Sequence, residues 1–165
     1  MQNSPLRLEA YFLKELKFSL TDDLRNVPDG SVKYDNINID VANEVAQRDD
    51  DSRRWRCELT VRSTDQKELK CPYRFSITFV GFFGVAEEFP AERVEMMVRA
   101  NAPALLYSAA REALMPITNR GPYPGMLLPS ITFIEPPKPD ILRKGGGKAK
   151  LPAQKGAARK SSKRK

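Results

Sequence analysis

The sequence predicts an α+β fold, in which a four-stranded antiparallel sheet is followed by two helices and a disordered C-terminal tail. Four stretches before residue 80 alternate apolar and polar side chains. This period of two buries one face of a sheet and leaves the other face wet. After residue 90 the apolar residues recur three and four positions apart, as they do on one face of a helix. No connection before that point looks like a crossover helix, which argues against a parallel sheet.

The four predicted strands are separated by segments with turn chemistry. Pro28-Asp29-Gly30 supplies a turn between the first two strands, and the charged loop from Arg48 to Arg54 separates the second from the third. In chain order, the apolar positions of the strands are Leu16, Phe18 and Leu20; Ile37, Ile39 and Val41; Trp55, Cys57, Leu59 and Val61; and Tyr73, Phe75, Ile77 and Phe79.

Strict alternation stops at the end of the fourth strand, where the sequence reads FVGFFGV from Phe79 to Val85. Apolar residues crowd both faces there, and the two glycines expose the backbone to close approach by another chain. Two interpretations stay open at this point. The stretch is either buried core or oligomer interface, or it is a surface that grips apolar peptide.

Two helices are predicted next. The first runs from Pro90 to Ala100, and Asn101-Ala102-Pro103 is expected to interrupt it. The second runs from about Pro103 to Asn119, with Pro116 distorting its last turn and Gly121 acting as a stop signal. Its apolar stripe consists of Leu106, Ala110, Ala113, Leu114 and Ile117.

The segment NRGPYPGMLLPSITFIEPP, from Asn119 to Pro137, combines prolines and glycines with large apolar residues. Proline removes backbone donors and keeps the chain out of helices and sheet centres. Such a segment can pack one side on the core and leave its other apolar side chains at the rim of a groove.

The positive charge of the chain is confined to its C-terminus. The net charge is +7, with 28 basic and 21 acidic residues. From Arg143 onward there are ten basic residues and no acids, so residues 1–142 carry 28 − 10 = 18 basic against 21 acidic groups, a net of −3. We therefore expect a folded domain over residues 1–140 and a disordered basic tail over 141–165. The basic residues of the tail are Arg143, Lys144, Lys148, Lys150, Lys155, Arg159, Lys160, Lys163, Arg164 and Lys165.

Three roles for this tail remain open. It either keeps the protein in solution, or attracts RNA, DNA or the ribosome through phosphate contacts, or associates with an anionic membrane surface.

The composition argues against catalysis, cofactors and metals. The chain has no histidine and two cysteines, Cys57 and Cys71, which leaves no Ser-His or Cys-His nucleophile pair and no structural zinc set. The acidic run at residues 49–51 is best explained as a solvated loop. No glycine-rich phosphate loop is present. We expect a cytoplasmic protein that does not insert into membranes, because there is neither a signal peptide nor an apolar run of membrane-spanning length.

The second predicted helix and the segment after it resemble the protein-export chaperone family SecB. The resemblance lies in NAPALLYSAARE at Asn101–Glu112, RGPYP at Arg120–Pro124 and LLPSITF at Leu127–Phe133, with FFGV at Phe82–Val85 at the right distance before the helices. It extends over roughly residues 8–135.

The resemblance implies a SecB-like fold assembled as a homotetramer, a dimer of dimers, without enzymatic activity. Members of the family hold non-native polypeptides in apolar grooves without ATP and pass many of them to the SecA translocation motor. By matching position, the groove candidates are Phe79, Phe82, Phe83, Leu127, Leu128, Ile131, Phe133, Trp55 and Tyr123.

One departure from the family concerns the surface that meets SecA. Glu15 matches an acidic docking position, whereas Ser19, Arg74 and Ser76 stand where acids or apolar groups would be expected. Two alternatives to an export chaperone therefore stay open. One is a SecB-like chaperone of an antitoxin, and the other is a ribosome- or nucleic-acid-associated protein that acts through its basic tail.

Overall fold

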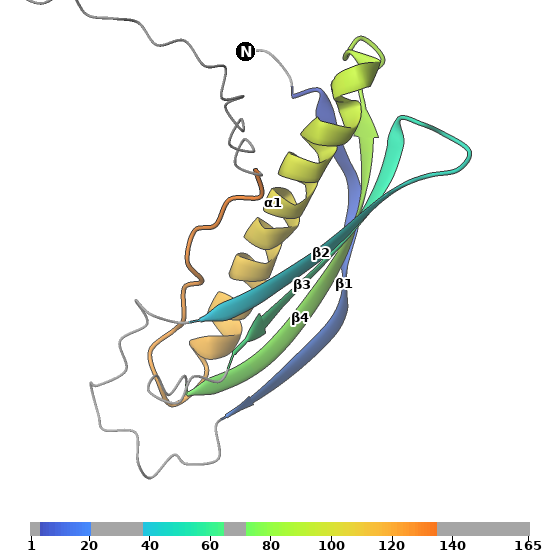
Figure 1. Cartoon of the computed structure of the whole chain (residues 1–165). Coiled ribbons are helices and arrows are strands. Elements are labelled where there is room, and N and C mark those ends of the chain that lie inside the picture. Colours follow the sequence, from blue (N-terminus) through green and yellow to red (C-terminus); the bar gives the residue numbers. More distant parts are fainter. Residues whose placement is uncertain (1–3, 21–37, 65–71, 135–165) are drawn as a thin grey trace, which may run out of the picture. The chain divides into compact units, whose positions relative to one another are not determined.

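The computed structural model describes residues 4–20, 38–64 and 72–134. Over these residues the fold is one antiparallel sheet with one long helix lying along it (Figure 1). The sheet has four strands in the order β1-β4-β3-β2. The elements are β1 (Leu6–Leu20), β2 (Ile39–Gln47), β3 (Arg54–Ser63), β4 (Tyr73–Val85) and α1 (Ala91–Thr118). The predicted four-stranded antiparallel sheet is confirmed.

The prediction of two helices is wrong, because α1 is continuous for 28 residues with Pro103 and Pro116 inside it. A proline within a helix removes one backbone hydrogen bond and costs about 3 kcal/mol. Here the predicted break sits on the buried side, since Ala102 and Pro103 are both buried. The side chain of Asn101 donates to the carbonyl of Met97 (2.7 Å) within the same helix and does not cap a new one. Packing on the sheet therefore outweighs the local break signal.

Pro103 and Tyr107 are buried in α1, and the other seven buried positions of the helix recur every four residues. They are Val94, Val98, Ala102, Leu106, Ala110, Leu114 and Thr118. Four residues turn a helix by about 40° more than a full circle, so this stripe winds slowly around α1. A sheet surface is itself twisted, and such a stripe can stay in contact with it. α1 packs mainly on the central strands β4 and β3 (Figure 1).

The edge strand β1 begins at Leu6, far earlier than the predicted Leu16. Its register against β4 shifts between Leu8 and Ala10 and again between Leu13 and Glu15. Each bulge inserts one extra residue and moves the following side chains to the other face. The residues on the helix side of the sheet are therefore Leu6, Leu8, Tyr11, Leu13, Leu16, Phe18 and Leu20. This spacing is not a simple alternation, which is why the period of two revealed only the last third of the strand.

The chain divides into two units, of which the first spans Met1–Glu135. The predicted domain boundary at residue 140 and the basic tail lie outside the described residues, and both stay predictions. Ile37, the first apolar position of the predicted second strand, also lies outside them. Within the described ranges, no helix is long and apolar enough to cross a membrane.

Candidate polypeptide-binding surface

The chain after α1, residues 119–134, turns back along the helix without regular secondary structure, and we call it the return segment (Figure 1, orange). Its start is fixed by the buried side chain of Thr118. The Thr118 hydroxyl accepts the N–H of Met126 (2.9 Å) and lies 3.0 Å from both the Leu114 and Met115 carbonyls, to which it donates. One hydroxyl therefore joins the last turn of α1 to the point where the segment reverses.

Tyr73, the first residue of β4, holds the same reversal from the sheet side. Its hydroxyl is 3.1 Å from the carbonyls of both Thr118 and Tyr123, and it accepts the N–H of Tyr123 at 3.3 Å. The ring of Tyr123 meets the ring of Tyr73 edge-on, with centroids 6.1 Å apart. Tyr73 is fully buried, so the reversal is fastened to the core and not only to the helix.

The return segment then divides its apolar side chains between core and solvent. Met126 and Leu128 are buried, at 0% and 1% exposure, whereas Leu127 and Ile131 are 52% and 37% exposed. The hydroxyl of Tyr107 on α1 donates to the carbonyl of Pro129 (2.7 Å). Burial raises the pKa of Tyr107, which keeps this hydroxyl protonated as a donor.

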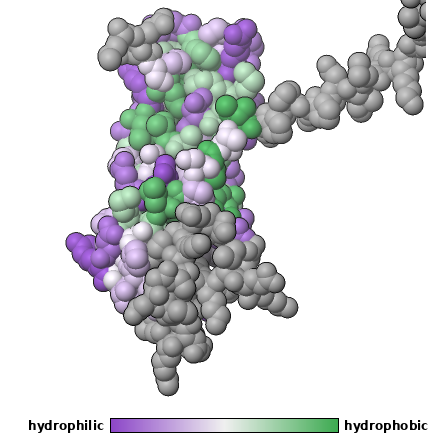
Figure 2. All heavy atoms as spheres, turned by 90° about the vertical axis from the view of Figure 1, so that its left-hand side faces the viewer, coloured by the Kyte–Doolittle hydropathy of each residue, from purple (hydrophilic) through white to green (hydrophobic). Residues whose placement is uncertain are grey.

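Farther along, the half-buried ring of Phe133 meets the ring of Tyr107 edge-on at 6.1 Å. The segment therefore lies against α1 on one side and presents Leu127, Ile131 and Ile134 on the other. Figure 2 views the molecule from the side on which the return segment lies, and hydrophobic side chains alternate there with polar ones along the folded part.

The nine groove candidates do not form a single surface. Phe79 and Phe83 lie under α1 and are buried, at 6% and 0% exposure. Phe82 lies on the opposite face of the sheet beside Phe12, with ring centroids 6.4 Å apart. Leu128 belongs to the core, and only Leu127 and Ile131 of the nine are large exposed hydrophobics. Three candidates are half-buried, namely Phe82, Tyr123 and Phe133, and the last two are partners of Tyr73 and Tyr107.

Three of the candidates do come together at one end of the sheet. Trp55, Phe82 and Phe83 line a hollow of about 240 Å³, with Arg54 on its rim. The indole N–H of Trp55 is buried and finds no hydrogen-bond partner in the part of the chain that the structure describes.

An apolar surface that the sequence reasoning missed lies on the helix side of β1. Leu8, Tyr11, Leu13 and Leu16, which we call the edge surface, are 38%, 50%, 44% and 37% exposed. The N–H of Ala86 donates to the carbonyl of Pro5, so these two facing residues form a hydrogen-bonded pair. Facing pairs in an antiparallel sheet alternate between hydrogen-bonded and non-hydrogen-bonded ones, so this pair tells which residues of β1 bond to β4. Counted along the register from that pair, Tyr11, Leu13 and Leu16 fall in non-hydrogen-bonded pairs. Their N–H and C=O groups therefore point away from β4, toward the outer side of this edge strand. Only an allowance for bulges could have revealed this face in the sequence.

Several of the remaining polar groups have structural surroundings. Burial raises the pKa of the Cys57 thiol to about 12, so it is a poor nucleophile. In the acidic loop, Asp50 pairs with Arg48 (2.6 Å) and Asp51 with Arg54 (3.4 Å), while Arg53 donates to the Ala86, Glu87 and Phe89 carbonyls at 2.8–3.1 Å. Within the described ranges, no three His, Cys, Asp or Glu side chains gather as a metal site would require.

Comparison with known families decides what kind of protein has this architecture. The family model of the preprotein translocase subunit SecB matches residues 1–135. This chain belongs to the SecB family.

The curated proteins that are similar to this chain in sequence include protein-export proteins SecB from several bacteria. That of Nitrobacter hamburgensis is 29% identical over 98 residues, which are 59% of this chain and 57% of the relative. That of Thioalkalivibrio sulfidiphilus is 30% identical over 91 residues, 55% of this chain and 54% of the relative. The chain thus spans about half the length of these SecB relatives.

Comparison with solved structures shows which known fold this chain shares. The SecB-like chaperone of Mycobacterium tuberculosis, in complex with a ChAD peptide from the HigA1 antitoxin, matches with a TM-score of 0.52 and 14% identity. The match covers 77% of this chain and 91% of that one. At this identity the likeness establishes a SecB-like fold and nothing further.

Proposed function

We propose that this chain is a chaperone of protein export that holds non-native polypeptides without ATP. The observation that carries the proposal is the return segment, which buries Met126 and Leu128 while exposing Leu127 and Ile131. Family membership over residues 1–135 supports it. An apolar side chain that moves from water into such a contact contributes about 1.5–3 kcal/mol. Several such contacts can therefore bind an unfolded segment without reading its sequence. No catalytic group and no cofactor is part of the proposal.

The test is suppression of aggregation by the full chain. A urea-unfolded model protein is diluted into buffer without nucleotide, and light scattering is followed with and without a stoichiometric excess of the chaperone. We expect scattering to fall. Unchanged scattering at excess chaperone would remove the proposal.

A pair of variants tests the assignment to the return segment. In Leu127→Gln with Ile131→Gln, we expect the affinity for the unfolded protein to fall by about tenfold or more. The matched control is Met96→Gln with Leu105→Gln, which changes two large exposed apolar residues of α1. An equal loss in both pairs would leave the holdase function standing but contradict the role of the return segment.

We further propose a homotetramer in which the edge surface of β1 is covered by another subunit. A long edge strand with exposed apolar side chains otherwise invites uncontrolled pairing. Light scattering that gives a monomeric mass at micromolar concentration would contradict this assembly.

Two other partners remain proposals. Glu15, the SecA-docking candidate, lies on the face of the sheet away from α1 and pairs with Lys17 at 2.9 Å. The basic tail could add attraction to the ribosome or to nucleic acid, which should then weaken steeply with salt and vanish when residues 143–165 are removed.

An antitoxin-directed chaperone is the second candidate function. Ser19, Arg74 and Ser76 lie on the same sheet face as Glu15, so the positions that depart from the acidic docking surface are grouped together. Pulldown from the native host would discriminate, since recovery of an antitoxin and no exported precursor would favour this candidate.

A further inference from the structure

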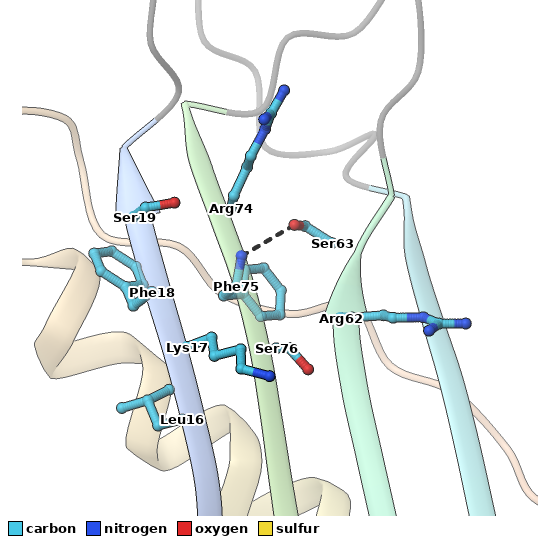
Figure 3. Close-up of a pocket in the computed structure, with 9 residues that line it drawn as sticks. All are labelled: Leu16, Lys17, Phe18, Ser19, Arg62, Ser63, Arg74, Phe75 and Ser76. Carbon is cyan, nitrogen blue, oxygen red and sulfur yellow. Dashed lines mark hydrogen bonds between the residues drawn. The ribbon is translucent and has the colours of Figure 1, made fainter.

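A hollow of about 610 Å³ lies at the end of the sheet where β1, β3 and β4 run side by side, and we call it the cationic hollow (Figure 3). Its polar lining consists of Lys17, Arg62 and Arg74 together with Ser19, Ser63 and Ser76. No carboxylate lines it in the described part of the chain. The feature is separate from the return segment, and Leu16 is the one residue that it shares with the edge surface in the described part of the chain.

The strand register arranges these side chains in rows. Lys17 on β1 pairs with Ser76 on β4, and Ser76 pairs with Arg62 on β3, which gives a cation, a hydroxyl and a cation across three strands. Neighbouring strands lie about 4.8 Å apart, so the Cα atoms of Lys17 and Arg62 are roughly 10 Å apart. In the next row Ser19 pairs with Arg74.

Lys17 and Arg62 already form ion pairs, and the carboxylate of a ligand can replace the acidic partner in each. Lys17 is bound to Glu15 at 2.9 Å, and Arg62 donates to Asp40 at 2.7 Å; both acids lie outside the lining. Figure 3 shows the Arg62 side chain extended away from β4. The side chains of Lys17 and Arg62 are 73% and 60% exposed, and pairs at such exposure contribute little. A carboxylate above Ser76 could therefore recruit both cations.

The lining favours a polypeptide over a nucleic acid. Binding of single-stranded nucleic acid relies on exposed aromatic rings on which bases stack. The two rings in this lining are Phe75, which is 4% exposed, and the half-buried Phe18, which packs on Tyr73, and both belong to the helix side of the sheet. Leu16, at 37% exposure, lies on the helix side of the edge strand β1, so a peptide side chain can contact it by passing around that edge. The hydroxyls of Ser19 and Ser76 can donate to carboxylate oxygens.

We propose that the cationic hollow binds an acidic linear segment of a partner polypeptide, with a carboxylate held over Ser76 between Lys17 and Arg62. This site is additional to the apolar surfaces of the holdase proposal, and it selects partners by charge.

The test measures binding of a labelled twelve-residue peptide of repeated Glu-Ser-Leu units to the full-length chain by fluorescence anisotropy. In Lys17→Gln with Arg62→Gln, we expect the affinity to fall about tenfold, and the exchanged pair Lys17→Arg with Arg62→Lys should retain it. The matched control, Arg93→Gln with Arg99→Gln, removes two exposed cations of α1, of which Arg99 is also ion-paired. All variants keep the basic tail, so any binding of the acidic peptide to the tail contributes equally to every affinity that is compared.

Three outcomes would overturn the proposal. The first is an equal loss in the control pair, which would indicate only general attraction. The second is equal binding of a Gln-Ser-Leu peptide by the unmodified chain. The third is that loss of Lys17 and Arg62 weakens binding of a single-stranded oligonucleotide but not of the acidic peptide, which would make the hollow a phosphate surface. Suppression of aggregation should be unchanged in all variants, so failure here is distinguishable from failure of the holdase function.

Discussion

The ring of Tyr73 fills the space in which a side chain at residue 121 would begin. A Cβ on Gly121 would lie 2.9 Å from Cε1 of Tyr73 and closer still to its hydroxyl. Because that hydroxyl is also bound to the backbone of Thr118 and Tyr123, the ring cannot move without breaking the reversal. Glycine at residue 121 is therefore required by close approach between the end of α1 and the start of β4.

We expect Gly121→Ala to lower the free energy of unfolding by about 1–3 kcal/mol, as overpacking of a buried site does. The measurement is urea denaturation followed by circular dichroism. Gly84→Ala is the matched control, since its new Cβ would meet the flexible carboxylate of Glu9, only 2.7 Å away but free to swing aside. Equal losses in the two variants would show that the Tyr73 contact is not what requires glycine.

Tyr73→Phe tests the hydroxyl itself. The change leaves the carbonyls of Thr118 and Tyr123 and the N–H of Tyr123 without their common partner. A buried polar group that loses its partner costs about 1–3 kcal/mol, so we expect lower stability and faster hydrogen exchange at the Tyr123 amide. Tyr11→Phe is the control, because the Tyr11 ring is half exposed and its hydroxyl is in no hydrogen bond of the described chain. Unchanged exchange at Tyr123 would contradict the anchoring role.

The sheet was predictable where its strands obey a simple period. β3 alternates as its sequence does, with Trp55, Cys57, Leu59 and Val61 all buried under α1. β1 was largely missed because the bulges at Glu9 and Lys14 shift its faces. β4 stops alternating after Phe79 because Val80 is buried on the face away from α1, in line with the crowding of apolar residues on both faces that the sequence indicated there.

The helix and the candidate surface show the limit of local signals. Asn101-Ala102-Pro103 is a sound break signal, yet burial of Ala102 and Pro103 against the sheet keeps α1 whole. The proline-rich segment was correctly expected to divide its apolar side chains, but only the contacts of Thr118 and Tyr107 decide that Met126 faces inward and Leu127 outward. Such tertiary hydrogen bonds leave no trace in composition or spacing.

A pH-dependent prediction concerns Glu58 on the face away from α1. The hydrogen bond from Lys14 (2.6 Å), together with Arg56, lowers the pKa of Glu58. A folded-state pKa below the unfolded one stabilises the protein above the unfolded value, and this contribution disappears as pH falls through the folded pKa. We therefore expect Glu58→Gln to be less stable than the parent at neutral pH, by a small amount typical of an exposed pair.

That difference should shrink as pH falls below about 4.3, the ordinary pKa of a glutamate, and vanish only below the lowered folded-state pKa of Glu58. Denaturation midpoints of the two proteins across this range give the measurement. Lys14→Gln should reproduce part of the same pH dependence, since it removes the main cation. A difference between parent and Glu58→Gln that persists unchanged at low pH would mean that packing, not charge, sets the effect.

The role of the edge surface in assembly is tested by two neighbouring residues on opposite faces of β1. Tyr11 and Phe12 are both 50% exposed, but Tyr11 lies on the helix side with Leu13, whereas Phe12 lies on the other face beside Phe82. A glutamate at residue 11 would be buried, charged and unpaired in an interface formed by the edge surface, which is strongly unfavourable. We therefore expect Tyr11→Glu to reduce the mass measured by light scattering, while Phe12→Glu keeps the mass of the parent. If Phe12→Glu alone dissociates the oligomer, the subunits associate through the opposite face of the sheet, and the edge surface is then left for clients.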